Sequence, residues 1–208
     1  MIQLNEYHDN IIPLLKVPVI QKITVLTVFF FISVCHAGAE EIWRLRYSVP
    51  TSAESEITRG SSKASEKLNT SGHSGNMVFA NGIGFGYSTV RTNGSLGGID
   101  YKFKNHSLDL AYTIGNDLSY TLGAGRLVYG RGEQSMSGTS YVTESSSGEA
   151  LFMNFGIPVL GGELLLGYRQ HNIEYKNFQS QISGQTVMLE DTVKLLSSQV
   201  NAGFGFLF

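Results

Sequence analysis

The chain has 208 residues, of which 15% are charged and 42% are hydrophobic, and its formal net charge is −2. This near-neutral balance gives no electrostatic basis for binding nucleic acid, so no nucleic-acid partner is expected. The chain has one cysteine, Cys35, which excludes a fold held by internal disulfides. Glycine, phenylalanine and tyrosine are frequent and only four prolines occur, a composition that favours strands over helices.

The N-terminal region has the layout of a secretory signal peptide. An apolar run over residues 23–34 follows two lysines and precedes the small residues Ala37 and Ala39. The run is shorter than the roughly 20 apolar residues that a bilayer-spanning helix needs. We therefore expect residues 1–37 to be a signal peptide, cleaved after Ala37 or Ala39, and residues 38–208 to form the mature domain. The first twenty residues contain Glu6, Asp9 and two prolines, which is unusual for a signal peptide and suggests a start codon assigned too far upstream.

Alternation of apolar and polar residues predicts an all-β chain with eight antiparallel strands. Each stretch approaches the roughly 9–11 residues that a tilted strand needs to cross a bilayer. In the first stretch, Trp43, Leu45 and Tyr47 share one face, while Arg44 and Arg46 share the other. The predicted strands are 41–49, 77–90, 99–103, 108–114, 118–129, 151–157, 164–171 and 200–208.

The connections between these stretches predict a topology. Asn105-His106 is expected to be a tight external turn, and loss of phase near Gly125-Arg126 predicts a β-bulge. Long polar external loops and short periplasmic turns are typical of outer-membrane barrels. The expected external connections are 50–76, 105–106, 131–148 and 176–191. The expected periplasmic connections are 92–96, 115–117 and 158–162.

The end of the chain is an alternating strand that terminates in an aromatic residue. Val200, Ala202, Phe204, Phe206 and Phe208 fall on one face, and small or polar residues fall on the other. A terminal aromatic after alternating apolar residues resembles the signal by which the barrel assembly machinery recognises bacterial outer-membrane barrels. The resemblance implies that Phe204, Phe206 and Phe208 form an assembly signal.

Charged residues fall on the predicted inner face of several strands. A narrow eight-stranded barrel is filled by its own side chains, so these charges are expected to pair with one another rather than to line a pore. The alternative fold is a soluble eight-stranded barrel with an apolar cavity, which so many inward charges disfavour. The predicted lumen charge cluster is Arg44, Arg46, Asp100, Lys102, Asp109 and Arg169.

Together, the signal segment, the eight stretches, Gly167-Tyr168-Arg169 and the final Phe208 resemble small eight-stranded outer-membrane β-barrels of the OmpA, OmpX and opacity-protein type. The resemblance implies a location in the bacterial outer membrane, in contact with outer-membrane lipid and lipopolysaccharide. It also implies a structural or surface-binding role, in which long external loops contact a surface ligand that the sequence does not identify.

The alternative function is a lipid A-modifying hydrolase, because a deacylase is known on barrels of this size. Such an enzyme needs a histidine that activates a serine hydroxyl on an outward face. Here the second residue after His171 is Ile173, and alternation turns His171 inward. His73, His106 and His171 lie far apart and lack cysteine partners, so no metal and no cofactor are expected. The leading expectation is a non-enzymatic barrel.

Overall fold

The computed structural model describes residues 43–60, 62–66, 68–115, 118–182 and 185–208. The expected signal peptide, residues 1–37, and residues 116–117 of the expected 115–117 turn lie outside these residues. The strands are β1 Arg44–Arg59, β2 Ser62–Glu66, β3 Asn69–Val78, β4 Ile83–Leu96, β5 Ile99–Ile114, β6 Ser119–Met136, β7 Thr139–Thr143, β8 Ser146–Val159, β9 Gly162–Ile182 and β10 Gln185–Leu207.

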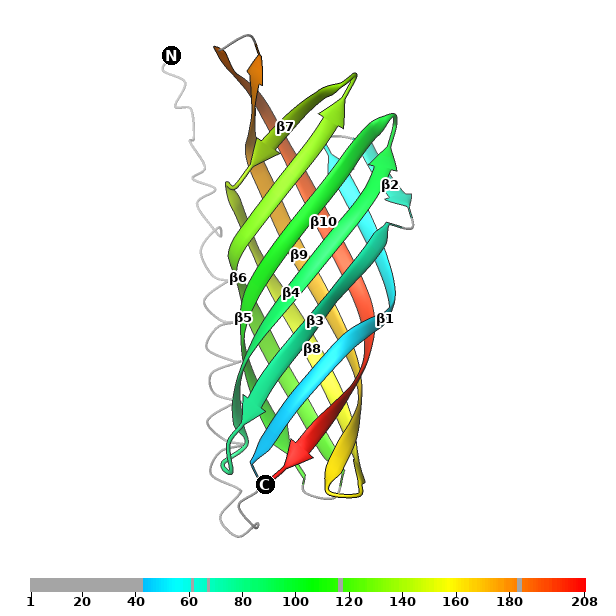
Figure 1. Cartoon of the computed structure of the whole chain (residues 1–208), viewed down its shortest axis with the longest axis vertical. Helices are drawn as coiled ribbons and strands as arrows, with labels where there is room; N and C mark the ends of the chain where they lie inside the picture. Colours follow the sequence, from blue (N-terminus) through cyan, green and yellow to red (C-terminus); the bar gives the residue numbers. More distant parts are fainter. Residues whose placement is uncertain (1–42, 61, 67, 116–117, 183–184) are drawn as a thin grey trace, which may run out of the picture. The chain divides into compact units, whose positions relative to one another are not determined.

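Eight of these strands form a closed antiparallel ring, as predicted, and the short β2 and β7 attach beyond it (Figure 1). The ring closes where the first strand meets the last, with Arg44 opposite Leu207. Backbone hydrogen bonds extend this closure by one residue, because Trp43 and Phe208 exchange N–H···O contacts of 3.1 and 2.9 Å. The C-terminal residue therefore takes part in the seam that makes the barrel continuous.

The predicted number of barrel strands is correct, but two errors in their assignment cancel in the count. One predicted strand is in fact two strands, and two predicted strands are in fact one. The stretch 77–90 is a hairpin of β3 and β4, which turns at residues 79–82 with Gly82 at φ 84°. The stretches 99–103 and 108–114 are one strand, β5, so Asn105-His106 is not a turn. The β4–β5 connection is Gly97-Gly98, with both residues at positive φ, and the predicted turn at 92–96 lies within β4.

Most of the predicted external loops are also strand. β9 has 21 residues and β10 has 23, about twice the length needed to cross a bilayer. The regions predicted as loops at 131–148 and 176–191 largely continue the barrel as paired strands. The bulge predicted near Gly125-Arg126 lies just beyond that dipeptide, since His106 pairs with Tyr129 and Ser107 pairs with Leu127, leaving Val128 unmatched.

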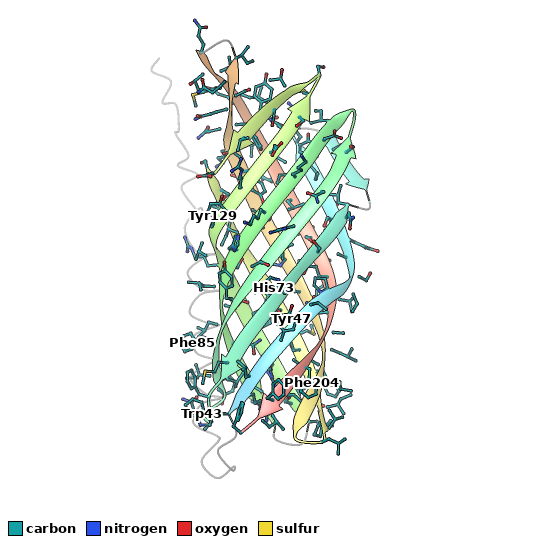
Figure 2. All side chains as sticks on the ribbon, viewed as in Figure 1. Trp43, Tyr47, His73, Phe85, Tyr129 and Phe204 are labelled. Carbon is teal, nitrogen blue, oxygen red and sulfur yellow. The ribbon has the colours of Figure 1, made fainter. Side chains whose placement is uncertain are left out.

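The half of the barrel nearest the C-terminus has an apolar outer surface. Exposed residues on it include Leu45, Phe85, Leu110, Leu122 and Phe206. In Figure 2, Trp43, Phe85 and Phe204 lie in this half, with Tyr129 farther toward the other end. An outward apolar band with aromatic residues at its margins is the surface that a bilayer requires of a spanning barrel.

Both faces of the strands change character beyond this belt. Along β5, the outward residues change from Leu110 and Leu108 to Lys104 and Lys102. The inward residues of the same strand change from Asp109 to apolar aromatic residues. The far half is thus built like a water-soluble barrel, polar outside and apolar inside, as expected for a segment that projects beyond the lipid. Its buried core comprises Ile57, Leu68, Tyr101, Phe103, Ile173, Tyr175, Phe178, Val193 and Leu195.

Candidate functional site

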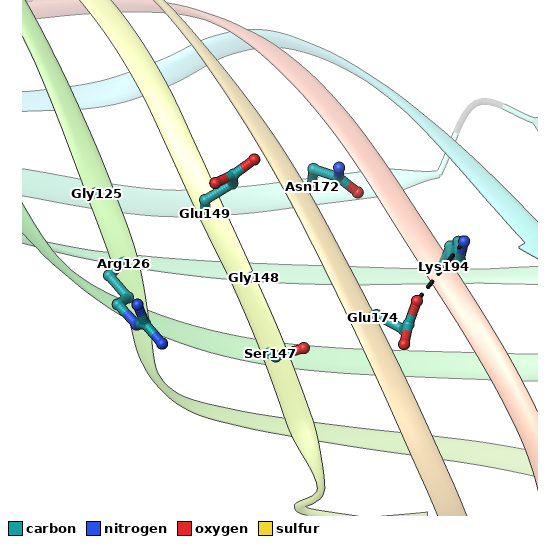
Figure 3. Close-up of a pocket in the computed structure, with 8 residues that line it drawn as sticks. All are labelled: Gly125, Arg126, Ser147, Gly148, Glu149, Asn172, Glu174 and Lys194. Atoms are coloured by element: carbon teal, nitrogen blue, oxygen red, sulfur yellow. Dashed lines mark ion pairs between the residues drawn. The ribbon is translucent and has the colours of Figure 1, made fainter. Parts of the chain in front are cut away.

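One hollow of about 500 Å³ lies on the outer surface of β6, β8, β9 and β10 (Figure 3). Two cations, Arg126 and Lys194, and two carboxylates, Glu149 and Glu174, line it. Arg126 lies opposite Glu149, and Glu174 contacts Lys194 at 3.6 Å and Lys176 at 2.5 Å. The hydrogen bond from Lys176 lowers the pKa of the Glu174 carboxyl below its usual value. This hollow therefore balances its own charge.

A second outward hollow, of about 310 Å³, lies on β4, β5 and β6 and has a different balance. Four of its lining residues are cations, and Glu133 is its single carboxylate. Glu133 lies 3.7 Å from the amine of Lys102, which places its charge at one side of the hollow. The remaining cations are Arg91, Lys104 and Arg131, and we refer to these three as the basic row.

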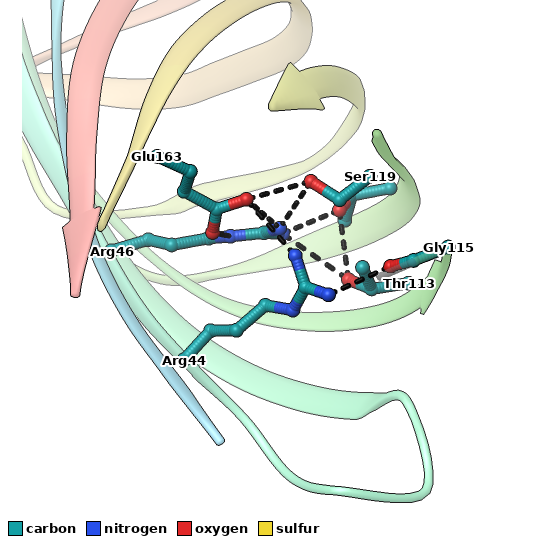
Figure 4. Close-up of polar contacts among 7 residues, drawn as sticks. Arg44, Arg46, Thr113, Gly115, Ser119 and Glu163 are labelled. Carbon is teal, nitrogen blue, oxygen red and sulfur yellow. Dashed lines mark hydrogen bonds and ion pairs between the residues drawn. The ribbon is translucent and has the colours of Figure 1, made fainter. Parts of the chain in front are cut away.

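Inside the barrel, Glu163 bridges two arginines near the end of the barrel at which the C-terminus lies (Figure 4). One Glu163 oxygen accepts from Arg46 Nε at 2.6 Å, and the other accepts from Arg44 Nη1 and Arg46 Nη2 at 3.0 Å each. The hydroxyl of Ser119 also donates to this carboxylate, at 2.7 Å. A Cβ at Gly156 would lie 2.3 Å from the carboxylate, so a larger residue there would displace Glu163 from its hydrogen-bonded position.

A second buried ion pair lies farther along the interior. Arg169 donates two hydrogen bonds to Asp109, at 2.7 and 3.1 Å, and a third to Ser88 at 2.7 Å. Its guanidinium also lies over the ring of Phe152, 4.3 Å from the centroid. A Cβ at Gly125 would lie 2.2 Å from Asp109, so this pair also depends on a glycine. Both clusters satisfy buried charges by pairing, as interior charges require.

The structure thus places Arg44, Arg46, Asp109 and Arg169 inside the barrel. The prediction is wrong for Asp100 and Lys102, which face outward and are exposed. The physical reason is the continuity of β5, in which Tyr101 and the other odd positions point inward.

Sequence reasoning also missed Glu163, the counter-ion of both arginines. Period-two alternation could have found it, because Glu163 and Arg169 are six residues apart and therefore share a face.

Above these ion pairs the interior is filled by aromatic rings. Phe103 stacks between Tyr101 and Tyr175, with centroid separations of 5.9 and 4.6 Å. The Tyr175 hydroxyl donates to Asn105 Oδ1 at 2.6 Å, and burial raises the pKa of Tyr175 above its usual value. These side chains fill the barrel axis of the projecting half, which is packing rather than the lining of a wide aqueous channel.

The three residues of the expected assembly signal lie at the closing seam. Phe204 and Phe206 point outward from β10, with their rings in an edge contact 5.0 Å between centroids. Phe208 is 74% exposed. Its ring therefore contributes little protein packing, and its role in assembly stays a prediction.

The chemistry expected of a hydrolase has no counterpart at His171. The side chain is 2% exposed and points inward, and neither ring nitrogen has a hydrogen-bond partner within the described chain. Among the described residues, no group of three or more potential metal ligands lies together. The residues that the structure describes also contain no helix that is long and apolar enough to cross a membrane.

No family model matches the chain, and its sequence matches no curated protein. Its structure is similar to Neisserial surface protein A (NspA), with 15% identity and a TM-score of 0.53 over 80% of this chain and 97% of that one. The chain has the fold of a small outer-membrane β-barrel. The fold and the apolar belt together place this barrel in the bacterial outer membrane.

Two further solved structures are similar. One is OprG from Pseudomonas aeruginosa, with 14% identity and a TM-score of 0.48 over 81% of this chain and 95% of that one. The other is Ail, the attachment invasion locus protein of Yersinia pestis, with 20% identity and a TM-score of 0.47 over 81% of this chain and 100% of that one.

Proposed function

We propose that this outer-membrane barrel is a surface-binding protein whose projecting half carries the binding surface. The observation that supports this proposal is the reversal of polarity along the strands. Beyond the lipid belt, β5 has Lys102 and Lys104 outside and Tyr101 and Phe103 inside. A packed core in that half is expected to hold the external strands in one conformation. A rigid surface loses less conformational entropy on binding than a flexible loop does.

The binding surface itself is expected at the outer tips of the strands. β6 and β7 form a hairpin that turns at Ser137-Gly138, and β7 has a single pairing contact with β9, Val142 opposite Gln179. The hairpin is therefore supported along one edge and open along the other. An open strand edge displays backbone donors and acceptors that a partner can pair with.

The proposal is tested on intact cells that produce the protein. Cells with the wild-type barrel should bind a subset of an array of immobilised host glycans and extracellular proteins that vector-only cells do not bind. Replacing residues 137–142 with a glycine-serine turn should abolish this binding while the heat-dependent gel mobility of the folded barrel stays unchanged. Binding that survives the replacement, or wild-type cells that bind no more than vector-only cells, would refute the proposal.

Lipid A mass spectrometry with and without the gene separates this proposal from the hydrolase alternative. A binding protein leaves the acyl-chain pattern of lipid A unchanged. Loss of one acyl chain that depends on the protein would instead assign the barrel an enzymatic function.

A further inference from the structure

The three cations of the basic row lie side by side on neighbouring strands. Arg91 on β4 is directly opposite Lys104 on β5, and Lys104 is directly opposite Arg131 on β6. Directly opposite side chains have Cβ atoms about 5 Å apart, and like charges in this arrangement destabilise a sheet. The row therefore reduces the stability of the folded barrel unless an anion neutralises it.

No carboxylate of the described chain forms an ion pair with these three cations, and the nearby Glu144 accepts a hydrogen bond from Tyr129 at 3.4 Å. None of the three cations forms an ion pair or a side-chain hydrogen bond within the described residues, whereas Lys102 in the same hollow lies near Glu133. The other outward hollow provides an internal comparison, since its Lys194 contacts Glu174. Of the two hollows, only the one that contains the basic row has an excess of positive charge.

The height of the row relative to the lipid belt limits what can reach it. Lys104 is four residues beyond the lipid-facing Leu108 on β5, about 13 Å along the strand. A strand tilt of 35–45° reduces this to about 10 Å along the membrane normal. A group about 10 Å beyond the hydrocarbon-facing Leu108 lies in the outer part of the headgroup layer or just above it, since this layer is about 5–8 Å thick on each side of an ordinary bilayer. Tyr129, an amphipathic aromatic residue, lines the same hollow.

We propose that the basic row binds the phosphate groups of an outer-leaflet glycolipid, with lipopolysaccharide as the ligand. Each guanidinium can donate two parallel hydrogen bonds to one phosphate, and the lysine between them supplies a point charge. This lipid site goes beyond the proposed surface-binding function and depends only on the location of the barrel in the outer membrane.

The test uses the barrel refolded in neutral detergent, with unfolding by urea followed through the fluorescence of Trp43, the only tryptophan. Purified lipopolysaccharide, the same material after dephosphorylation, and inorganic phosphate are titrated separately. Intact lipopolysaccharide should raise the unfolding midpoint of the wild type, because a ligand that binds only the folded state stabilises it. Dephosphorylated lipopolysaccharide, and inorganic phosphate at the same phosphate concentration, should have much smaller effects.

Lys104→Gln should weaken binding about fivefold, and the triple variant Arg91→Gln, Lys104→Gln, Arg131→Gln should weaken it on the order of a hundredfold. Without an anion, Lys104→Gln should unfold at the same or a higher urea concentration than the wild type, because the repulsion is reduced. If Lys104 only stabilised the fold, Lys104→Gln would instead unfold at a lower urea concentration than the wild type. Lys194→Gln is the matched control, an outward lysine in the charge-balanced hollow, and should bind like the wild type.

Three results would overturn the proposal. The first is equal stabilisation by dephosphorylated lipopolysaccharide, and the second is a Lys104→Gln variant that binds like the wild type. The third is a full shift with inorganic phosphate, which would indicate a site for free anions rather than for a lipid. Each result leaves the array experiment on surface binding unaffected, so the two proposals fail independently.

Discussion

The bridge at Glu163 allows a quantitative test of how the interior stabilises the barrel. Glu163→Gln keeps the shape of the side chain but removes the charge that two buried arginines share. Removing one partner of a buried ion pair costs about 3–5 kcal/mol. Several donors keep other acceptors, since Arg44 also donates to the Gly115 carbonyl at 2.7 Å and Arg46 donates to Ser119 at 2.9 Å. We therefore expect the lower end of this range, about 3 kcal/mol.

The assay is equilibrium unfolding by urea of barrels refolded into lipid vesicles. Trp43 is a suitable reporter because its backbone closes the seam with Phe208. Glu149→Gln is the matched control, since this carboxylate is exposed in the charge-balanced hollow and should change the free energy of unfolding by less than about 0.5 kcal/mol. If Glu163→Gln also stays within about 1 kcal/mol of the wild type, the buried bridge does not hold the barrel in the way that we infer.

Three further predictions concern the lipid belt, the external core and assembly. A charge at Leu110 should cost about 2–4 kcal/mol near the bilayer midplane, and a fluorescent label at Leu110 should be quenched by lipid-borne quenchers while one at Asp109 should not; equal quenching at both would refute the assigned phase of β5. Phe103→Ala should cost about 3–5 kcal/mol and should expose the projecting half to protease on intact cells, whereas Lys102→Ala should have little effect on either. Deleting Phe208 should reduce the amount of assembled barrel in cells but only slightly affect refolding into detergent in vitro, and normal assembly under strong expression would contradict its role as a signal.

Several features could be predicted from the sequence because they depend on period-two alternation alone. This rule predicts which residues of β1 and β10 face the lipid. It also predicts the inward direction of Arg44, Arg46, Arg169 and His171. In these stretches the apolar face contacts lipid, so local pattern and environment agree. The bulge near Gly125-Arg126 was predictable for the same reason, since an extra residue shifts the phase of the alternation.

The missed hairpin at residues 79–82 had a local signal. Asn81-Gly82 is a favoured turn dipeptide, and Gly82 has the positive φ that such a turn needs. It was missed because the alternation of Gly82, Gly84 and Gly86 continues through the turn and suggests one uninterrupted strand.

Only the tertiary structure decided which face of β5 points inward beyond the membrane. Alternation identifies two faces of a strand but does not show whether the apolar face contacts lipid or a protein core. At Tyr101 and Phe103 the apolar face packs against Tyr175 inside the barrel, which turns Asp100 and Lys102 outward. The inward direction of Glu163 follows from alternation with Arg169, but its pairing with Arg46, which is 117 residues away in sequence, does not. Closure of the ring brings the two together, and a pattern read along a single strand contains no information about that distance.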